Sequence, residues 1–167
     1  MSSVIFVKVI KAKKLNSASL RMKLINEMHV IARGVLDDYK STTRTWEHQP
    51  KFEKVMALKP NGPELLIGTD DRVYRYVDEG TKPHRIIARN KRALAFKPNY
   101  KAKTVPGKLT SRKGGASGRR IFRYMVDHLG FEARGFSKLI QKKWERRFKD
   151  RMERTMKEWA KHAQTKP

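Results

Sequence analysis

A long run of cationic side chains is the strongest chemical feature of this 167-residue chain. From Lys82 to Arg123 every charged residue is Lys or Arg, and the segment contains no Asp or Glu. Guanidinium and ammonium groups bind phosphates and carboxylates, so such a run favours an anionic partner over a merely solvated surface. The residues we expect to contact DNA or an acidic partner are Lys101, Lys103, Lys108, Arg112, Lys113, Arg119 and Arg120.

The whole chain shares this bias, with 40 Lys and Arg against 16 Asp and Glu and a formal net charge of +24. DNA, RNA and acidic proteins are all attracted to a surface of this kind. Composition alone does not choose among these three partners.

A group of carboxylates precedes the cationic run and raises the question of an enzyme. Asp70, Asp71, Asp78 and Glu79 near Lys82 could be arranged as a magnesium-dependent nuclease site. The spacing around Glu79 lacks the common nuclease signature, and Asp70 and Asp71 are placed to cap a helix. We therefore expect no catalytic residues and no enzymatic activity.

Metal and cofactor sites are not indicated either. The chain has no cysteine, which excludes disulfides, thiolate metal sites and a Cys nucleophile. None of the five histidines forms a pair at metal-binding spacing. The glycines at 114–118 resemble a phosphate-binding loop in composition only, so we expect no cofactor.

Two long helices should frame the fold. The periodicity of apolar residues predicts a helix from Ser17, with Asn16 or Ser17 as its N-cap, to Tyr39, and its apolar face should pack on a sheet. A second helix is predicted over 135–162. Its apolar stripe drifts around the helix, so the late members should meet a neighbouring subunit. These interface candidates are Met152, Met156 and Trp159.

Short strands and turns fill the space between the helices. Strands are predicted at Val4–Ile10, Phe52–Leu58, Glu64–Gly68, His84–Ala88, Ala93–Lys97 and Arg119–Val126, with a short helix capped by 69–71. The stretch at 98–118, rich in Gly, Pro, Ser and Lys, is predicted to be a flexible basic loop. The order of elements predicts one α+β domain over 1–167, in which a small antiparallel sheet packs against both long helices.

Three ordered pieces of the second half form a recognisable set. They are Val77-Asp78-Glu79-Gly80-Thr81-Lys82-Pro83-His84, then Ala93-Leu94-Ala95-Phe96, then His128-Leu129-Gly130-Phe131-Glu132-Ala133-Arg134-Gly135-Phe136. This set resembles the tail-completion, or head–tail joining, proteins of long-tailed bacteriophages, the family that includes the minor tail protein Z type. Leu129 and Gly135 depart from it, because the family usually has Pro at the first position and often at the second.

The turn in the first piece should be built by its backbone. Gly80 tolerates a positive φ, and the Thr81 hydroxyl can hydrogen-bond the turn. Asp78 and Glu79 should pair with Arg or Lys of the same or an adjacent subunit. The residues of this family-motif turn are Asp78, Glu79, Gly80, Thr81, Pro83 and His84.

The resemblance implies a structural virion protein made in the host cytoplasm and located at the head–tail junction. It implies a homo-oligomer, a hexameric ring of copies, around the DNA channel of a tail that is more often non-contractile. Its partners would be further copies, a tail terminator or tail tube protein, a head connector or stopper protein, and the packaged double-stranded DNA, with no membrane involved. The alternative is a basic nucleic-acid-binding protein, such as a ribosomal-type or nucleoid factor, for which the charge alone suffices.

Overall fold

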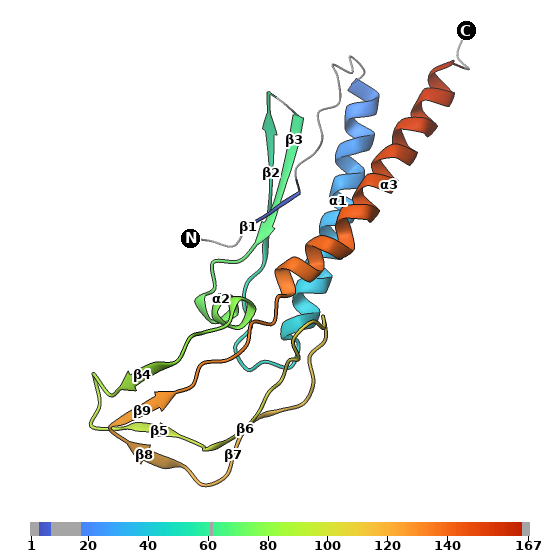
Figure 1. The fold of residues 1–167 in the computed structure, drawn as a ribbon. Coiled ribbons are helices and arrows are strands. Elements are labelled where there is room, and N and C mark those ends of the chain that lie inside the picture. The colour runs from blue at the N-terminus through green and yellow to red at the C-terminus, as the bar shows by residue number, and fades with distance from the viewer. Residues whose placement is uncertain (1–3, 8–17, 61, 165–167) are drawn as a thin grey trace.

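The computed structural model describes residues 4–7, 18–60 and 62–164. Within these residues, three helices and nine short strands follow one another along the chain (Figure 1). In chain order they are β1 (Val4–Val7), α1 (Ala18–Thr43), β2 (Glu53–Lys59), β3 (Gly62–Gly68), α2 (Arg72–Glu79), β4 (His84–Ile87), β5 (Leu94–Phe96), β6 (Asn99–Lys101), β7 (Gly115–Ser117), β8 (Ile121–Arg123), β9 (Met125–His128) and α3 (Phe136–Gln164). The predicted α+β class is confirmed.

Helix α1 continues past Tyr39, where its apolar pattern predicts an end, to Thr43. The hydroxyls of Ser41 and Thr42 each donate to the carbonyl three residues earlier, at 2.7 Å, and Thr43 does the same at 3.3 Å. These bonds satisfy polar side chains within the helix, so the last turn needs no apolar residue. The predicted N-caps, Asn16 and Ser17, lie outside the described residues.

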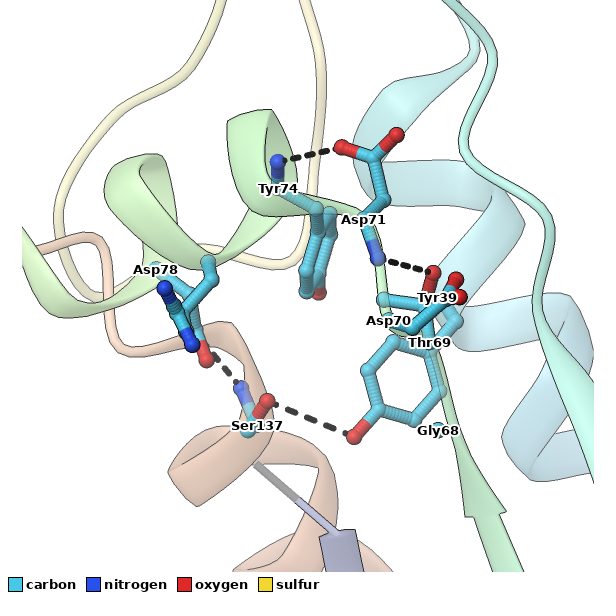
Figure 2. Close-up of a pocket in the computed structure, with 9 residues that line it drawn as sticks. Tyr39, Gly68, Thr69, Asp70, Asp71, Tyr74, Asp78 and Ser137 are labelled. Atoms are coloured by element: carbon cyan, nitrogen blue, oxygen red, sulfur yellow. Dashed lines mark hydrogen bonds between the residues drawn. The ribbon is translucent and has the colours of Figure 1, made fainter. Parts of the chain in front are cut away.

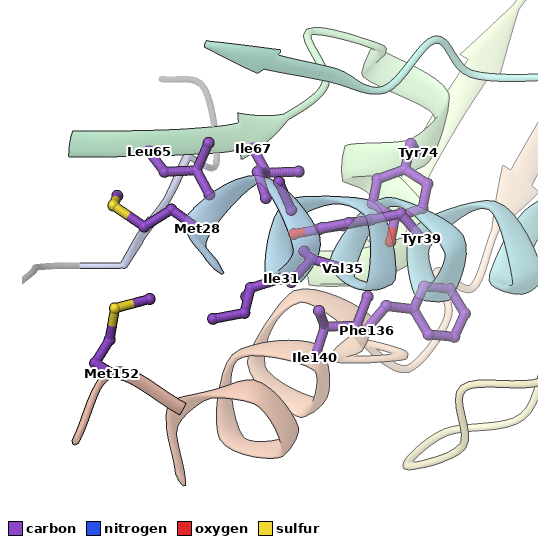
Figure 3. Packing of buried hydrophobic residues seen from close by; sticks show 11 residues of the cluster. Met28, Ile31, Val35, Tyr39, Leu65, Ile67, Tyr74, Phe136, Ile140 and Met152 are labelled. Carbon is purple, nitrogen blue, oxygen red and sulfur yellow. The ribbon is translucent and has the colours of Figure 1, made fainter. Parts of the chain in front are cut away.

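The first sheet joins the strands predicted at 52–58 and 64–68 with the start of the strand predicted at 4–10. Its order is β1-β3-β2, and all pairs are antiparallel. Leu65 and Ile67 of β3 are both buried, and they point toward α1 (Figure 3). The prediction that α1 packs on a sheet is therefore confirmed.

Helix α3 packs on α1, and the two run antiparallel (Figure 1). Trp144 lies against Gly34 and donates its indole N–H to Asp38 at 2.6 Å. Arg151 pairs with Glu27 further along the two helices. An alanine Cβ at position 34 would lie 2.2 Å from the Trp144 ring, so the glycine that weakens α1 also makes room for this indole.

The sequence predicts that the last apolar residues of α3 meet a neighbouring subunit. This prediction is wrong for Met152. This side chain is buried in the core of its own chain with Met28 and Ile31 (Figure 3). Met156 is half-buried, and Trp159 donates its indole N–H to Ser19 of α1 at 3.0 Å. Helix α1 therefore covers part of the drifting stripe, and the subunit-interface prediction for Met156 and Trp159 stays a prediction.

The remaining strands form one two-stranded ribbon, residues 81–131. The Thr81–Phe131 bridge closes its base, followed by the pairs β4–β9, β5–β8 and β6–β7, and by the Thr104–Ser111 bridge near its tip. Figure 1 shows the ribbon leaving the body through β4 and β9 and returning along β5 and β6. The predicted strand over Arg119–Val126 is thus split into β8 and β9 at the bend, where the Ala88 N–H donates to the Tyr124 carbonyl.

The segment 98–118, which the sequence predicts to be a flexible basic loop, forms the outer part of this ribbon and contains paired strands. Strands β6 and β7 pair across it, and Leu109 at the tip packs against the core. The Ser111 hydroxyl donates to the Ser41 carbonyl of α1 at 3.0 Å, and the Ser41 hydroxyl, shared with Asp38, lies 3.2 Å from the Leu109 carbonyl oxygen. The ribbon is therefore attached to the body at both its base and its tip.

Candidate partner-binding site

Two pieces of the sequence motif meet at the base of the ribbon. Thr81 and Phe131 exchange backbone hydrogen bonds of 3.0 and 3.1 Å. Gly80 and Gly130 flank this bridge with φ of +78° and +76°. A Cβ on Gly130 would lie 2.2 Å from the Thr81 carbonyl oxygen, so only glycine allows the two strands to approach this closely. The prediction that Gly80 serves a positive φ is confirmed.

Asp78 has a structural role in this region. Its side chain is buried, and it accepts the Ser137 N–H at 3.1 Å in the first turn of α3 (Figure 2). The Asp78 carbonyl accepts the Gly135 N–H at 3.0 Å. A carboxylate at a helix N-terminus satisfies free donors and complements the helix dipole. The expected pairing of Asp78 with a basic side chain is replaced by this helix cap.

The other motif residues take different positions. The Thr81 hydroxyl is buried without a hydrogen-bond partner, so the prediction that it bonds the turn is wrong. Pro83 and His84 are exposed. The His84 ring lies 5.1 Å from the His128 ring across the β4–β9 pair. Glu79 is exposed at the end of α2.

The carboxylates considered for a nuclease do not form a metal site. Asp71 caps α2 by accepting the Tyr74 N–H at 2.8 Å, and it also contacts His48. Burial raises the pKa of Asp71, but these hydrogen bonds outweigh burial and hold it below its usual value. In the part of the chain that the structure describes, no three His, Asp or Glu residues are placed to hold a metal ion.

A small pocket beside these residues is too narrow for a substrate. Tyr39, Tyr74, Asp78 and Ser137 line it together with the 68–71 turn (Figure 2). Its volume of about 30 Å³ is room for one or two water molecules. Burial raises the pKa of Tyr39 to about 12. The side chains around this pocket therefore belong to the packing between α1, α2 and α3.

The predicted contact cations are spread over the ribbon. All are exposed except Lys103, whose side chain is 15% exposed and lies 3.6 Å from Glu47. Asp127 is the only acid in the ribbon sequence, and it forms an ion pair of 2.7 Å with Arg85. No other ribbon cation has a carboxylate within ion-pairing distance among the described residues. The ribbon therefore presents mostly unneutralised positive charge.

The same ribbon exposes large apolar side chains, which sequence reasoning missed. Leu129 is 86% exposed, Tyr100 and Tyr124 are each 65% exposed, and Phe122 is 61% exposed. Ile86, Ile87 and Met125 add to this surface. Aromatic residues interleaved with Lys and Arg were visible in the sequence, but their exposure depends on the ribbon having only two strands. These exposed apolar side chains therefore accompany the exposed cations on the same ribbon.

A cavity of about 680 Å³ lies between the ribbon and the body, and we call it the ribbon cavity. This volume lies within the range of ligand-binding sites. Its wall is largely apolar and aromatic, with a few charged groups. The residues that line it include Trp46, Glu47, Val73, Tyr100, Lys103, Phe131 and Arg134.

Arg134 lines the ribbon cavity and also contains an unsatisfied polar atom. Its Nε is buried and makes no hydrogen bond. Its backbone N–H donates to the Val77 carbonyl of α2 at 3.1 Å, and its carbonyl accepts the Gly107 N–H of the ribbon tip at 3.3 Å. Its backbone is thus held between the helix and the ribbon.

Among the residues that the structure describes, no helix is long and apolar enough to cross a membrane. Comparison of the chain with protein-family models, curated proteins and solved structures gives no match.

Proposed function

We propose that the protein is a structural component of a tailed-phage virion that completes the tail and joins it to the head connector. In this proposal, copies form a ring around the DNA channel, six in the family that the motif resembles. The protein catalyses no reaction and needs no cofactor. Its work is done by interface area and by charge complementarity.

The ribbon carries the proposal. It combines exposed Tyr100, Phe122 and Leu129 with unneutralised cations on one element that is attached to the body at both ends. A surface that exposes both apolar area and uncompensated charge favours burial against a partner. Since this element is pre-formed, little conformational entropy is lost when neighbours cover it.

Charge determines which neighbours fit. Copies with a net charge of +24 repel one another, so a ring requires anions nearby. DNA in the channel supplies phosphates, while the tail and connector proteins are proposed to supply acidic surfaces. Many Lys and Arg contacts to DNA in every copy would hold the genome too firmly for release. We therefore divide the cations between DNA and acidic protein neighbours.

Assembly of ribbon variants tests this proposal. Phe122→Ser together with Tyr124→Ser removes exposed aromatic surface from the ribbon, and Met22→Ser removes a similarly exposed apolar side chain from α1. Native mass spectrometry and negative-stain imaging should show rings for the wild type and Met22→Ser, and smaller species for the double variant at unchanged helix content. A wild-type protein that stays monomeric with DNA and tail proteins, or is absent from virions, rules the proposal out.

One observation favours the alternative of a dedicated nucleic-acid-binding protein. Tyr100, Phe122 and Tyr124 alternate with cations such as Lys101 and Arg123 on the ribbon, and exposed aromatics beside cations bind nucleic acids by stacking. Fluorescence anisotropy with labelled DNA separates the two functions. Tight binding by a monomer or dimer, with a steep loss of affinity as salt rises, supports the alternative.

A further inference from the structure

We propose that the ribbon cavity binds an extended segment of a neighbouring protein in which acidic residues alternate with bulky apolar residues. This inference rests on the proposed function, because it specifies the chemistry of one virion neighbour. Charge alone would attract an acidic neighbour to any part of the ribbon. The ribbon cavity gives that neighbour one defined site.

Arg134 provides the first contact. Arg134 lines the cavity, and its Nε–H, which is closed off from solvent, makes no hydrogen bond. No carboxylate of the described residues lies within ion-pairing distance of its guanidinium. The two terminal nitrogens of a guanidinium can both donate to one carboxylate, so an incoming carboxylate can pair with Arg134 without reaching its Nε.

Lys103 provides the second contact. Its side chain is 15% exposed and faces Glu47 at 3.6 Å, whereas the Glu47 side chain is 97% exposed. Glu47 is already surrounded by water and loses little when it moves away from Lys103, since ion pairs of exposed groups are weak. A carboxylate from the occupant can take its place beside the largely buried ammonium.

The apolar wall defines the rest of the occupant. Trp46, Val73 and Phe131 line the cavity together with Tyr100, and these side chains offer no charge to a polar ligand. A segment that binds here needs apolar side chains between its carboxylates. In an extended chain, alternating residues point to opposite sides, so such a segment can meet the apolar wall and the two cations together.

Charge complementarity distinguishes this occupant from the others. A second copy of this chain brings a net charge of +24, so its approach to two cations is unfavourable. Nucleic acid brings phosphates, which find fewer cations lining the cavity than on the rest of the ribbon. An acidic protein segment satisfies both the cations and the apolar wall.

A peptide-binding experiment on the full chain tests the proposal. The probe is a short fluorescein-labelled peptide in which aspartates alternate with phenylalanine and leucine. Arg134→Gln and Tyr100→Ser alter the cavity, while Lys91→Gln removes an exposed ribbon cation that does not line it. Loss of at least about tenfold in affinity is expected for the cavity variants, and little change for Lys91→Gln.

The indole N–H signals in NMR spectra locate the bound peptide. Trp46 lines the cavity, whereas Trp159 lies against Ser19 at the other end of the helix pair. Peptide binding should shift the Trp46 signal and leave Trp159 unchanged. This readout on the wild type does not depend on whether Arg134→Gln folds.

Three results would overturn the proposal. The first is equal weakening by Lys91→Gln, or displacement of the peptide by oligothymidine of equal charge, since either indicates diffuse attraction to the ribbon. The second is no binding of the peptide. The third is a Trp46 shift on concentrating the wild type alone, which assigns the cavity to a second copy. If rings form while the peptide fails to bind, the proposed function stands and this inference does not.

Discussion

Replacing Gly130 by alanine should open the base of the ribbon. The left-handed backbone at φ +76° costs an L-residue about 1–2 kcal/mol. The new Cβ would also lie 2.2 Å from the Thr81 carbonyl oxygen, so the Thr81–Phe131 bridge must separate. Losing its two hydrogen bonds costs about 0.5–1.5 kcal/mol each. The expected destabilisation is therefore about 2–5 kcal/mol.

The matched control for this change is Gly107→Ala at the ribbon tip. Gly107 has φ +71°, but a Cβ added there would meet no atom within 4 Å, so only the backbone cost of about 1–2 kcal/mol applies. Urea denaturation measures both variants, and trypsin cleavage of the Lys- and Arg-rich ribbon reports its local opening. Gly130→Ala should be cut faster than Gly107→Ala. Equal stability and equal cleavage of the two variants would refute the role assigned to the close Thr81–Gly130 approach.

Three further changes can be followed by urea denaturation. Gly34→Ala should gain up to about 1 kcal/mol of stability from helix propensity. It should lose about 1–3 kcal/mol of stability because the new Cβ collides with Trp144. A net gain in stability would contradict this packing. Asp78→Ala should cost about 0.5–2 kcal/mol by removing the cap on the Ser137 N–H, and unchanged stability would mean that water replaces the cap. Tyr39 has a pKa of about 12 in the folded chain against 10.0 ordinarily, so the unfolded chain loses this proton first and stability falls as pH rises from 10 towards 12. Tyr39→Phe should be less stable than the wild type near neutral pH, and this difference in stability should narrow as pH rises from 10 towards 12. A constant difference in stability would contradict the pKa shift.

The elements set by local signals could be predicted from the sequence. The apolar periodicity placed α1 and α3, and the Pro and Gly turn at 60–63 placed the β2–β3 hairpin. Asp71 was predicted to cap α2, and it does. Each of these signals acts between residues close in the chain, so each can be read without the tertiary structure.

The ribbon could not be predicted because its pairing joins distant residues. His84 pairs with His128, and Asn99 pairs with Ser117 across a segment rich in Gly and Lys. That segment lacks the alternation of apolar and polar residues that marks a half-buried strand. Its order depends on contacts made elsewhere, such as Leu109 against the core.

The ribbon cavity was missed for a related reason. Trp46, Tyr100 and Arg134 come from three separate parts of the chain, and they meet only because the ribbon folds back. Arg134 stood in the sequence as one cation among many. Its buried, unpartnered Nε distinguishes it only once the fold is known.

The attachment of the ribbon at both ends changes what its charge can do. A free basic loop would adapt to any polyanion and would lose entropy on binding. A ribbon held by Gly130 at its base and Leu109 at its tip keeps the backbone that carries its cations in one arrangement, although the cations repel one another. The fold thus holds these cations near one another against their mutual repulsion. A partner whose anions match their arrangement would reduce this repulsion. Selectivity for such a partner then depends on the geometry of the anions as well as on their number.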